Sequence, residues 1–293
     1  MEARRGAWRS PTNAHSPGFD LLALDADVLE ALAGALFQDR VRDLAAAPLD
    51  VSGPALRALG EAARANGYRT FVHAVSRAPY LPLAGGLRAH EASLSRNLRH
   101  DVQRRLRRLC EAGIVSVEVS DGSARLDDLL EEGLRVEALS WKGRRGTAIA
   151  SGEETTRFYT GLARWAASAG WLRLAFLRLD GRAIAFQLDL QLRATYYSLK
   201  IGYDPEFERF SPGKLLAYTM VSRAVASGLQ AYELLGREEP WKDRWTELAR
   251  EQVEFRAFSP SPAGRLACST FVYGRPLARR IPFASRVAAG LRR

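Results

Sequence analysis

The sequence predicts a mixed α/β (α+β) fold in which helices flank a mostly antiparallel sheet. Two runs of alternating apolar residues, 171–179 and 182–192, are separated by Asp180-Gly181. That dipeptide is typical of a type I′ hairpin turn, so the two runs predict an antiparallel pair. A third strand is expected at 195–203. Helical patterns surround these strands at residues 125–139, 153–168 and 211–227.

The first part of the chain has weaker patterns. Residues 1–18 contain two Ser-Pro pairs and read as a disordered leader. A short strand is expected at 19–24, followed by alanine- and leucine-rich helical stretches, one of which runs from Pro54 to Asn66 and is closed by Gly67. Another strand is expected at 70–75.

The middle and end of the chain alternate more clearly. Residues 79–83 (PYLPL) predict an extended connector, because each proline disfavours a helical residue before it. An amphipathic helix follows at about 94–111, with leucines and a valine on one face and arginines on the other. The remaining strands are expected at 114–120, 230–235 and 253–258.

Composition excludes several classes of protein. The chain has 293 residues, of which 47% are hydrophobic and 26% charged, as in an ordinary globular protein. No apolar run is long enough to span a membrane, and the N-terminus lacks the apolar core of a secretion signal. Two distant cysteines give no disulfide framework, which fits a cytoplasmic protein. The four histidines lack ligand spacing, so no metal site is expected.

The net charge of +10 is unevenly distributed. Residues 94–109 contain six arginines and one aspartate, and residues 261–293 contain seven arginines and no acidic residue. Two basic elements are therefore attached to a nearly neutral body. Nucleic acid, anionic lipid and phosphorylated substrates are all compatible partners.

Only four of the 43 basic residues are lysines, and all four lie between residues 142 and 242. Either their positions are a chance remainder, or they mark places where a compact ammonium group is needed and a planar guanidinium would not fit.

An anion site is suggested by Ser211-Pro212-Gly213-Lys214. Serine as N-cap and proline at the first helical position predict the start of a helix, whose free N–H groups and dipole favour negative charge. Gly213 would let a phosphate approach the backbone, and Lys214 would add a charge. The same tetrapeptide also begins many purely structural helices.

Three further features are ambiguous. Glu233 lies in an expected strand, where it either faces a cleft as a general base or occupies a solvated edge. The segment 241–245 (WKDRW) either fixes Lys242 between two tryptophans or anchors a loop. The basic turn 141–146 (WKGRRG) either clamps a phosphate or carboxylate, or is a solvated loop.

Several catalytic signatures are missing from the sequence: a GxSxG elbow, a Walker loop, a GxGxxG turn after a strand, and a Cys/His nucleophile pair. An enzyme without a nucleophile can still transfer an acyl group directly. It must orient an amine or hydroxyl against an activated ester and stabilise the oxyanion.

A family resemblance extends these points. Six stretches occur in order between Pro79 and about Phe258: PYLPL, SLSRNLRHDVQRRLRRLCEAG, SWKGRRGTA, GWLRLAFLRLDGRAIAFQLDL, YYSLKIGYDPEFERFSPGKLLAY and GREEPWKDRW. Together they resemble the CelD-type (BcsL-like) acyltransferases of the GNAT superfamily. This resemblance implies a GNAT-like sheet and a relationship to the Fem-type transferases, which use aminoacyl-tRNA.

The resemblance also implies roles for individual residues. Glu233 and Lys242 would be catalytic, and no metal is implied. The donor, acyl-CoA, would bind at Lys200, Ser211, Pro212, Gly213, Lys214 and Leu215. The acceptor is expected at Trp141, Lys142, Arg144, Gln187, Tyr203 and Trp245. Trp241 departs from the family pattern, which has tyrosine there, so a phenol acting as proton donor is in doubt.

The expected organisation is a disordered leader (1–18), a partial GNAT-like half (19–90), a GNAT-like acyltransferase domain (91–260) and a basic tail (261–293). The leading function is transfer from acyl-CoA to an amine or hydroxyl of a sugar, cell-envelope or secondary-metabolite acceptor, including polysaccharide precursors. The alternatives are a Fem-like aminoacyl-tRNA-dependent transferase and a non-catalytic membrane-associated scaffold. Expected partners are a small-molecule or glycan acceptor, tRNA at 94–109 and the tail, an anionic membrane at its inner face, and a second copy in a homodimer.

Overall fold

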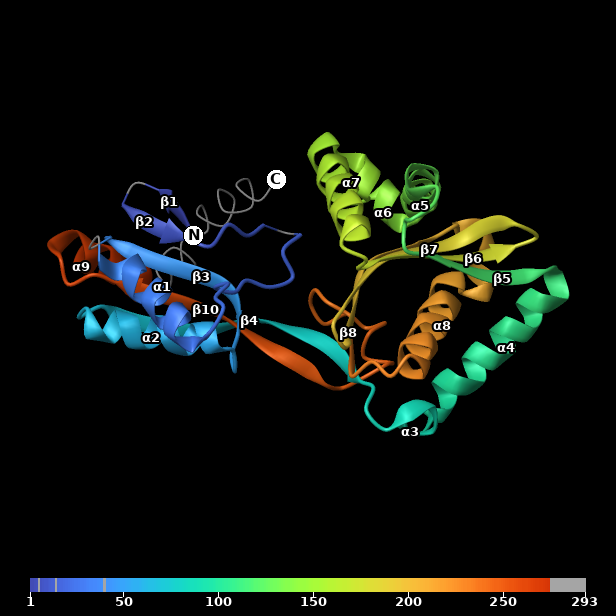
Figure 1. The fold of residues 1–293 in the computed structure, drawn as a ribbon, viewed down its shortest axis with the longest axis horizontal. Helices are drawn as coiled ribbons and strands as arrows, with labels where there is room; N and C mark the ends of the chain where they lie inside the picture. The colour runs from blue at the N-terminus through green and yellow to red at the C-terminus, as the bar shows by residue number, and fades with distance from the viewer. Residues whose placement is uncertain (5, 14, 39–40, 275–293) are drawn as a thin grey trace. The chain divides into compact units, whose positions relative to one another are not determined.

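A computed structural model describes residues 1–274, apart from residues 5, 14, 39 and 40. The first helices and strands are β1 (Glu2–Arg4), β2 (Ala7–Arg9), α1 (Ala26–Gln38), β3 (Asp43–Asp50), α2 (Pro54–Ala65), β4 (Arg69–Pro82), α3 (Gly86–Ser93), α4 (Arg96–Ala112), β5 (Val115–Ser120), α5 (Leu126–Leu139) and α6 (Trp141–Arg144) (Figure 1). The others are α7 (Glu153–Ser168), β6 (Leu172–Leu179), β7 (Arg182–Leu192), β8 (Thr195–Tyr203), α8 (Pro212–Ala226), β9 (Ala231–Glu233), β10 (Ala249–Phe258) and α9 (Pro262–Ser269).

The chain forms two units, which divide it differently from the expected domains. Unit 1 combines residues 1–77 with the described residues from Arg250 on, and unit 2 contains residues 78–249. The expected boundary near residue 90 moves because the strand at 70–75 and the connector at 79–83 merge into one strand, β4. Both β4 and β10 run across the boundary between the units.

Unit 1 is built from both ends of the chain. Its strand order is β1-β2-β3-β10-β4, with β2 parallel and β10 antiparallel to β3. Its core includes Phe37, Leu44, Leu59 and Phe255, all nearly inaccessible to solvent. The strand expected at 253–258 therefore exists, but it belongs to the first unit and not to the 91–260 domain. Its partner β3 lies about 200 residues away in sequence, which local patterns do not reveal.

The N-terminal segment differs from the expectation. Residues 1–18 contain β1 and β2 in place of a disordered leader, because Ala7 is buried and Ser10 donates its hydroxyl to the Ala47 carbonyl at 2.9 Å. No strand forms at 19–24, where Leu22 and Leu24 are almost fully exposed.

The described part of the basic tail also belongs to unit 1. The helix α9 begins at Pro262 and is capped by Ser261, whose side chain accepts the Gly264 N–H. After it, Phe271 packs edge-on against Phe71 and tilted against Phe258. Residues 275–293, which make up most of the expected basic tail, lie outside the described residues.

Unit 2 contains the mostly antiparallel sheet that the sequence predicts. Its strand order is β4-β9-β8-β7-β6-β5, and the neighbours pair antiparallel except for β8 and β9. The turn between β6 and β7 has positive φ at both Asp180 (49°) and Gly181 (82°), which confirms the type I′ hairpin. The helix α7 has the predicted bounds, 153–168.

Helices cover both faces of this sheet. The helices α4 and α8 pack on one face, while α5 and α7 pack on the other (Figure 1). Leu98, Val102 and Leu109 are the buried residues of α4, as its amphipathic pattern predicts, although Leu106 is 43% exposed. The fold is thus a mixed α/β sheet flanked by helices.

Candidate active site

The two parallel strands of unit 2 separate after a short contact. Strands β8 and β9 pair only over residues 195–197 and 231–233, and β8 then continues to Tyr203 after β9 has ended. Glu233 is the last residue of β9 and is 5% exposed; it lies opposite Tyr197 of β8 and Tyr80 of β4. It is therefore not on a solvated edge.

A lysine and a glutamate meet beside the free part of β8. Glu137 of α5 is completely buried, and one of its carboxylate oxygens accepts the Ile149 N–H at 2.8 Å. Its other oxygen lies 3.6 Å from Nζ of Lys142 in α6. The Lys142 ammonium also donates to the Ile201 carbonyl of β8 at 2.6 Å.

A glycine lets α5 approach the strand this closely. A Cβ atom on Gly202 would lie 2.4 Å from Cα of Glu137, so any larger residue at position 202 would push α5 away from β8. Gly202 therefore helps to place the Glu137 carboxylate beside Lys142.

Lys200 of β8 belongs to the same group. Its Nζ lies 4.9 Å from the centre of the Tyr159 ring of α7. Within the described part of the chain, no side-chain or backbone oxygen accepts a hydrogen bond from this half-buried ammonium. Burial, assisted by Glu137, raises the pKa of Tyr159 to about 12, so Tyr159 is a neutral phenol at ordinary pH.

Lys242 completes the group from the loop after β9. Its side chain is buried, and Nζ donates to the carbonyls of Leu235 at 2.6 Å and Arg237 at 2.8 Å. Positive φ angles at Leu235 (53°) and Gly236 (61°) turn the loop around the ammonium. The ring of Trp241 lies 5.4 Å from Nζ.

Lys142 interacts electrostatically with both Lys200 and Lys242, and we call these three residues the lysine cluster. Burial lowers the pKa of each, and the charge of Lys142 lowers the pKa of the other two further. Glu137 and Glu239 oppose the shift at Lys142. A partly desolvated excess of positive charge attracts an anionic group or a developing oxyanion.

The start of α8 differs in part from the expectation. The helix begins at Pro212 as predicted, but Ser211 adopts a left-handed conformation (φ 51°) and its side chain makes no capping bond. The carbonyl of Ser211 instead accepts from the backbone N–H groups of Lys214 and Leu215. Among the described residues, the Gly213 N–H has no acceptor.

Lys214 points to α4 and has a partner there. Its Nζ donates to Asp101 at 2.6 Å, and Arg104 and Arg105 bind the same carboxylate. Burial acts to raise the pKa of Asp101, but these three hydrogen bonds outweigh it and hold the pKa well below its usual range. The Lys214 ammonium is thus already bound to a carboxylate within the protein.

The other expected donor and acceptor residues lie in several places. Leu215 is a core residue, and Tyr203 contacts the start of α8, since a Cβ on Gly213 would lie 3.4 Å from its ring. Trp245 is buried and packs at 6.5 Å from the ring of Tyr218. The side chains of Trp141 and Arg144 lie outside the described part of the structure.

Gln187 belongs to a second buried polar group, on the α4 and α8 face of the sheet. It donates weakly to Ser198 at 3.4 Å, and neighbouring Asp189 accepts from the Tyr196 hydroxyl at 3.1 Å. Burial raises the pKa of Asp189 well above its usual range, which favours a protonated carboxyl. The Tyr196 ring stacks on Tyr232 at 5.0 Å.

Sequence reasoning missed Glu137, Tyr159 and Asp189. Glu137 could have been found, because it follows Leu130 and Leu134 at helical spacing and so falls on the apolar face of α5. Asp189 alternates with apolar residues in β7 and resembles a solvent-facing position; it is buried because helices cover both faces of the sheet.

The described residues contain neither a metal site nor a membrane span. Among them, no three His, Cys, Asp or Glu side chains converge in a way that could hold a metal ion. No described helix combines the length and apolar character needed to cross a bilayer.

Comparisons with solved structures show the same fold in three proteins. FemX is 15% identical, with a TM-score of 0.60 over 83% of this chain and 79% of its own. The C-terminal domain of a putative lysylphosphatidylglycerol synthetase from Agrobacterium fabrum is 14% identical, with a TM-score of 0.54 over 84% of this chain and 77% of that one. L-PGS from Bacillus licheniformis is 14% identical, with a TM-score of 0.52 over 85% of this chain and 78% of its own.

No curated protein matches the chain significantly. A family model described as an acetyltransferase (GNAT) domain matches residues 96–243. This match covers just over half of the chain and includes the lysine cluster, Glu137 and the start of α8. The chain therefore belongs to the acetyltransferase (GNAT) domain family, and it is an acyltransferase.

Proposed function

We propose that unit 2 transfers an acyl group from acyl-CoA to an amine or hydroxyl group of a sugar, cell-envelope or secondary-metabolite acceptor. The observation that carries this proposal is Lys200. A half-buried ammonium that feels the charge of Lys142, with no hydrogen-bond acceptor among the described residues, is costly unless an anion balances it. The phosphates of an activated carrier and the oxyanion of acyl transfer are both such anions.

The proposed transfer is direct. The acceptor nitrogen or oxygen attacks the thioester carbonyl, the carbon–sulfur bond breaks, and an amide or ester forms with release of the CoA thiol. Glu233 takes the proton of the attacking group as general base, and the thiolate is then protonated. The third N–H of Lys242, which the Leu235 and Arg237 carbonyls leave free, stabilises the oxyanion.

Donor binding is assigned to the free Gly213 N–H and to the lysine cluster. Lys214 holds α8 to α4 through Asp101, so its ammonium already has a hydrogen-bond acceptor within the protein. This modifies the role that the family resemblance implies for Lys214. Lys200 and Lys214 therefore form a matched pair for testing donor binding.

Calorimetry with acetyl-CoA and longer acyl-CoAs tests this assignment. Lys200→Met should weaken binding about tenfold, the usual effect of losing one hydrogen bond to a charged group. Lys214→Met is the matched control and should leave affinity close to that of the wild type. The opposite ranking of the two variants would place the donor beside α4 and contradict the assignment.

Turnover tests the general base. Glu233→Gln should slow acyl transfer to amino-sugar acceptors, measured as release of the CoA thiol, by about 100-fold or more. The affinity for acyl-CoA should stay unchanged. A variant that turns over normally would remove Glu233 from the mechanism.

The second candidate is transfer from aminoacyl-tRNA. It is favoured by the fold shared with FemX and the two synthetases over more than 80% of this chain, and by the exposed arginines of α4. Arg107 and Arg108 are both exposed and could contact phosphates without reading sequence.

A gel shift with aminoacyl-tRNA at low and high salt separates the two donors. If tRNA is the donor, the double substitution Arg107→Glu and Arg108→Glu should weaken the protein–tRNA complex strongly. Rising salt concentration should dissociate the wild-type complex. Arg157→Glu, an exposed change on α7, is the control. No shift at low salt would leave acyl-CoA as the proposed donor.

A further inference from the structure

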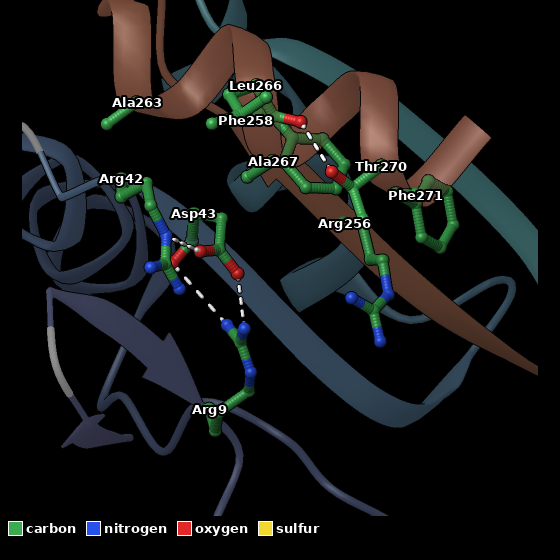
Figure 2. Close-up of a pocket in the computed structure, with 10 residues that line it drawn as sticks. All are labelled: Arg9, Arg42, Asp43, Arg256, Phe258, Ala263, Leu266, Ala267, Thr270 and Phe271. Atoms are coloured by element: carbon green, nitrogen blue, oxygen red, sulfur yellow. Dashed lines mark hydrogen bonds and ion pairs between the residues drawn. The ribbon is translucent and has the colours of Figure 1, made fainter. Parts of the chain in front are cut away.

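Unit 1 contains a cavity of about 520 Å³, and none of its lining residues belongs to the proposed acyltransfer site. Its charged lining consists of Arg9, Arg42, Asp43 and Arg256 (Figure 2). An apolar wall is formed largely by α9 and the turn after it, including Leu266 and Phe271. Leu266 is 70% exposed, which is unusual for a leucine in a folded unit. The cavity thus combines cationic and apolar surfaces.

One carboxylate holds two of the guanidinium groups. Asp43 is the first residue of β3 and its side chain is 4% exposed. Arg9 binds one of its oxygens, and Nε of Arg42 donates to the other at 2.7 Å (Figure 2). Asp43 therefore positions both arginines but can neutralise only one of them.

The third arginine has its partner outside the cavity lining. Arg256 lies on β10, stacks its guanidinium 4.8 Å from the Phe271 ring centre, and donates from Nε to Glu254 at 2.8 Å. The Glu254 carboxylate also lies 2.7 Å from Nε2 of His73. With Glu254 included, two carboxylates offset the three guanidinium groups, which leaves an excess of one positive charge.

Some guanidinium N–H groups of the cavity lining have no acceptor among the described residues. Within the described part of the chain, both terminal nitrogens of Arg42 lack an acceptor, and its side chain is 41% exposed. Guanidinium groups at short range repel one another unless an anion lies between them. A tetrahedral dianion can accept hydrogen bonds from several guanidinium forks at once.

We propose that this cavity binds a phosphoryl group attached to a short apolar moiety. The negatively charged phosphoryl group is attracted by the excess positive charge and binds Arg42, with Arg9 and Arg256 around it. The apolar moiety covers Leu266 and Phe271. The ligand is either a soluble phosphate ester or the headgroup of an anionic lipid, since both present the same chemistry.

Calorimetry on the full chain with phenyl phosphate, inorganic phosphate and phenol tests this proposal. Phenyl phosphate should bind most tightly, inorganic phosphate more weakly, and phenol least. Arg42→Ala should weaken phenyl phosphate binding about tenfold, and Arg42 is exposed enough for the variant to fold. The control is Arg57→Ala, an exposed arginine of α2 outside the cavity.

A second variant keeps the test independent of stability. Asp43→Asn removes a negative charge but preserves shape, so phenyl phosphate should bind more tightly than to the wild type even if the melting temperature falls. Tighter binding supports the site. Unchanged or weaker binding, with a folded variant, overturns it and makes the arginines a purely structural group.

Vesicle sedimentation distinguishes the two sources. Vesicles of phosphatidylcholine with phosphatidic acid are compared with phosphatidylcholine alone, for the wild type and Arg42→Ala. Binding that Arg42→Ala reduces identifies a lipid headgroup, whereas phenyl phosphate binding without such vesicle binding identifies a soluble ester. Failure of both probes, or binding that Arg42→Ala does not change, overturns the proposal.

Discussion

Each unit of this protein places one buried carboxylate beside cationic side chains, but the cations differ. In unit 1, Asp43 binds Arg9 and Arg42 through their planar guanidinium groups, and these side chains are 32% and 41% exposed. In unit 2, Glu137 lies beside lysines that are buried enough to lower their pKa values. Arginine stays charged at any ordinary pH, whereas a desolvated lysine can lose its proton. Unit 1 is thus suited to hold an anion permanently, and unit 2 to change its charge during chemistry.

The largest expected effect is the loss of the unit 2 carboxylate. Glu137→Ala removes the carboxylate that lies 3.6 Å from Nζ of Lys142 and leaves the Ile149 N–H without its acceptor. We expect the free energy of unfolding to fall by about 3–5 kcal/mol, because a buried charge pair is broken from one side. Urea denaturation measures it, with Glu131→Ala, exposed on the same helix, as the control.

A change in backbone spacing should cost less. Gly202→Ala places a methyl group 2.4 Å from Cα of Glu137 and must push α5 away from β8. We expect a loss of about 1–3 kcal/mol, as for other overpacked sites. Gly161→Ala, inside α7 with open space around it, should instead gain up to about 1 kcal/mol. Equal effects of the two substitutions would contradict the close contact.

The carboxylate of unit 1 should matter less than that of unit 2. Asp43→Ala leaves Arg9 and Arg42 free to turn to water, because 32% and 41% of their side chains are exposed. We therefore expect a loss of only about 1–2 kcal/mol in the same urea experiment. A larger loss than that of Glu137→Ala would reverse the comparison between the two units.

The smallest expected effect is a dependence on pH. The folded state holds Lys200 with a lowered pKa, so between that pKa and about 10.4 the unfolded chain binds more protons. Stability from this group therefore increases as pH rises through that window. Lys200→Met should reduce the slope of unfolding free energy against pH, whereas Arg42→Met should leave it unchanged. Identical slopes for the wild type and Lys200→Met would show that Lys200 is not desolvated.

Local signals explain what could be predicted. The hairpin at Asp180-Gly181 and the start of α8 at Pro212 depend on a few adjacent residues, and both occur where expected. The scarcity of lysine left chance and a special role both open, and in the structure the charge of Lys142 acts on both Lys200 and Lys242. Their positions depend on β8 continuing beyond the end of β9, which is a property of strand pairing that no single segment encodes.

Distant partners explain what could not be predicted. Lys214 carries a charge that suggests ligand binding, but its partner Asp101 lies 113 residues earlier on another helix. In the same way, β10 resembles the last strand of the transferase region until its pairing with β3 is known. The roles inferred for Glu233 and Lys242 remain predictions, since their burial fits a function without identifying the reaction.

The return of β10 to unit 1 has a consequence for synthesis on the ribosome. This strand lies between β3 and β4 in the sheet order, so the two earlier strands emerge with a gap that stays open until all of unit 2 has been translated. For that period β3 exposes unpaired backbone groups, the kind of edge that invites association with another chain. Nascent protein halted before residue 249 should therefore be captured by chaperones far more than protein halted after residue 270.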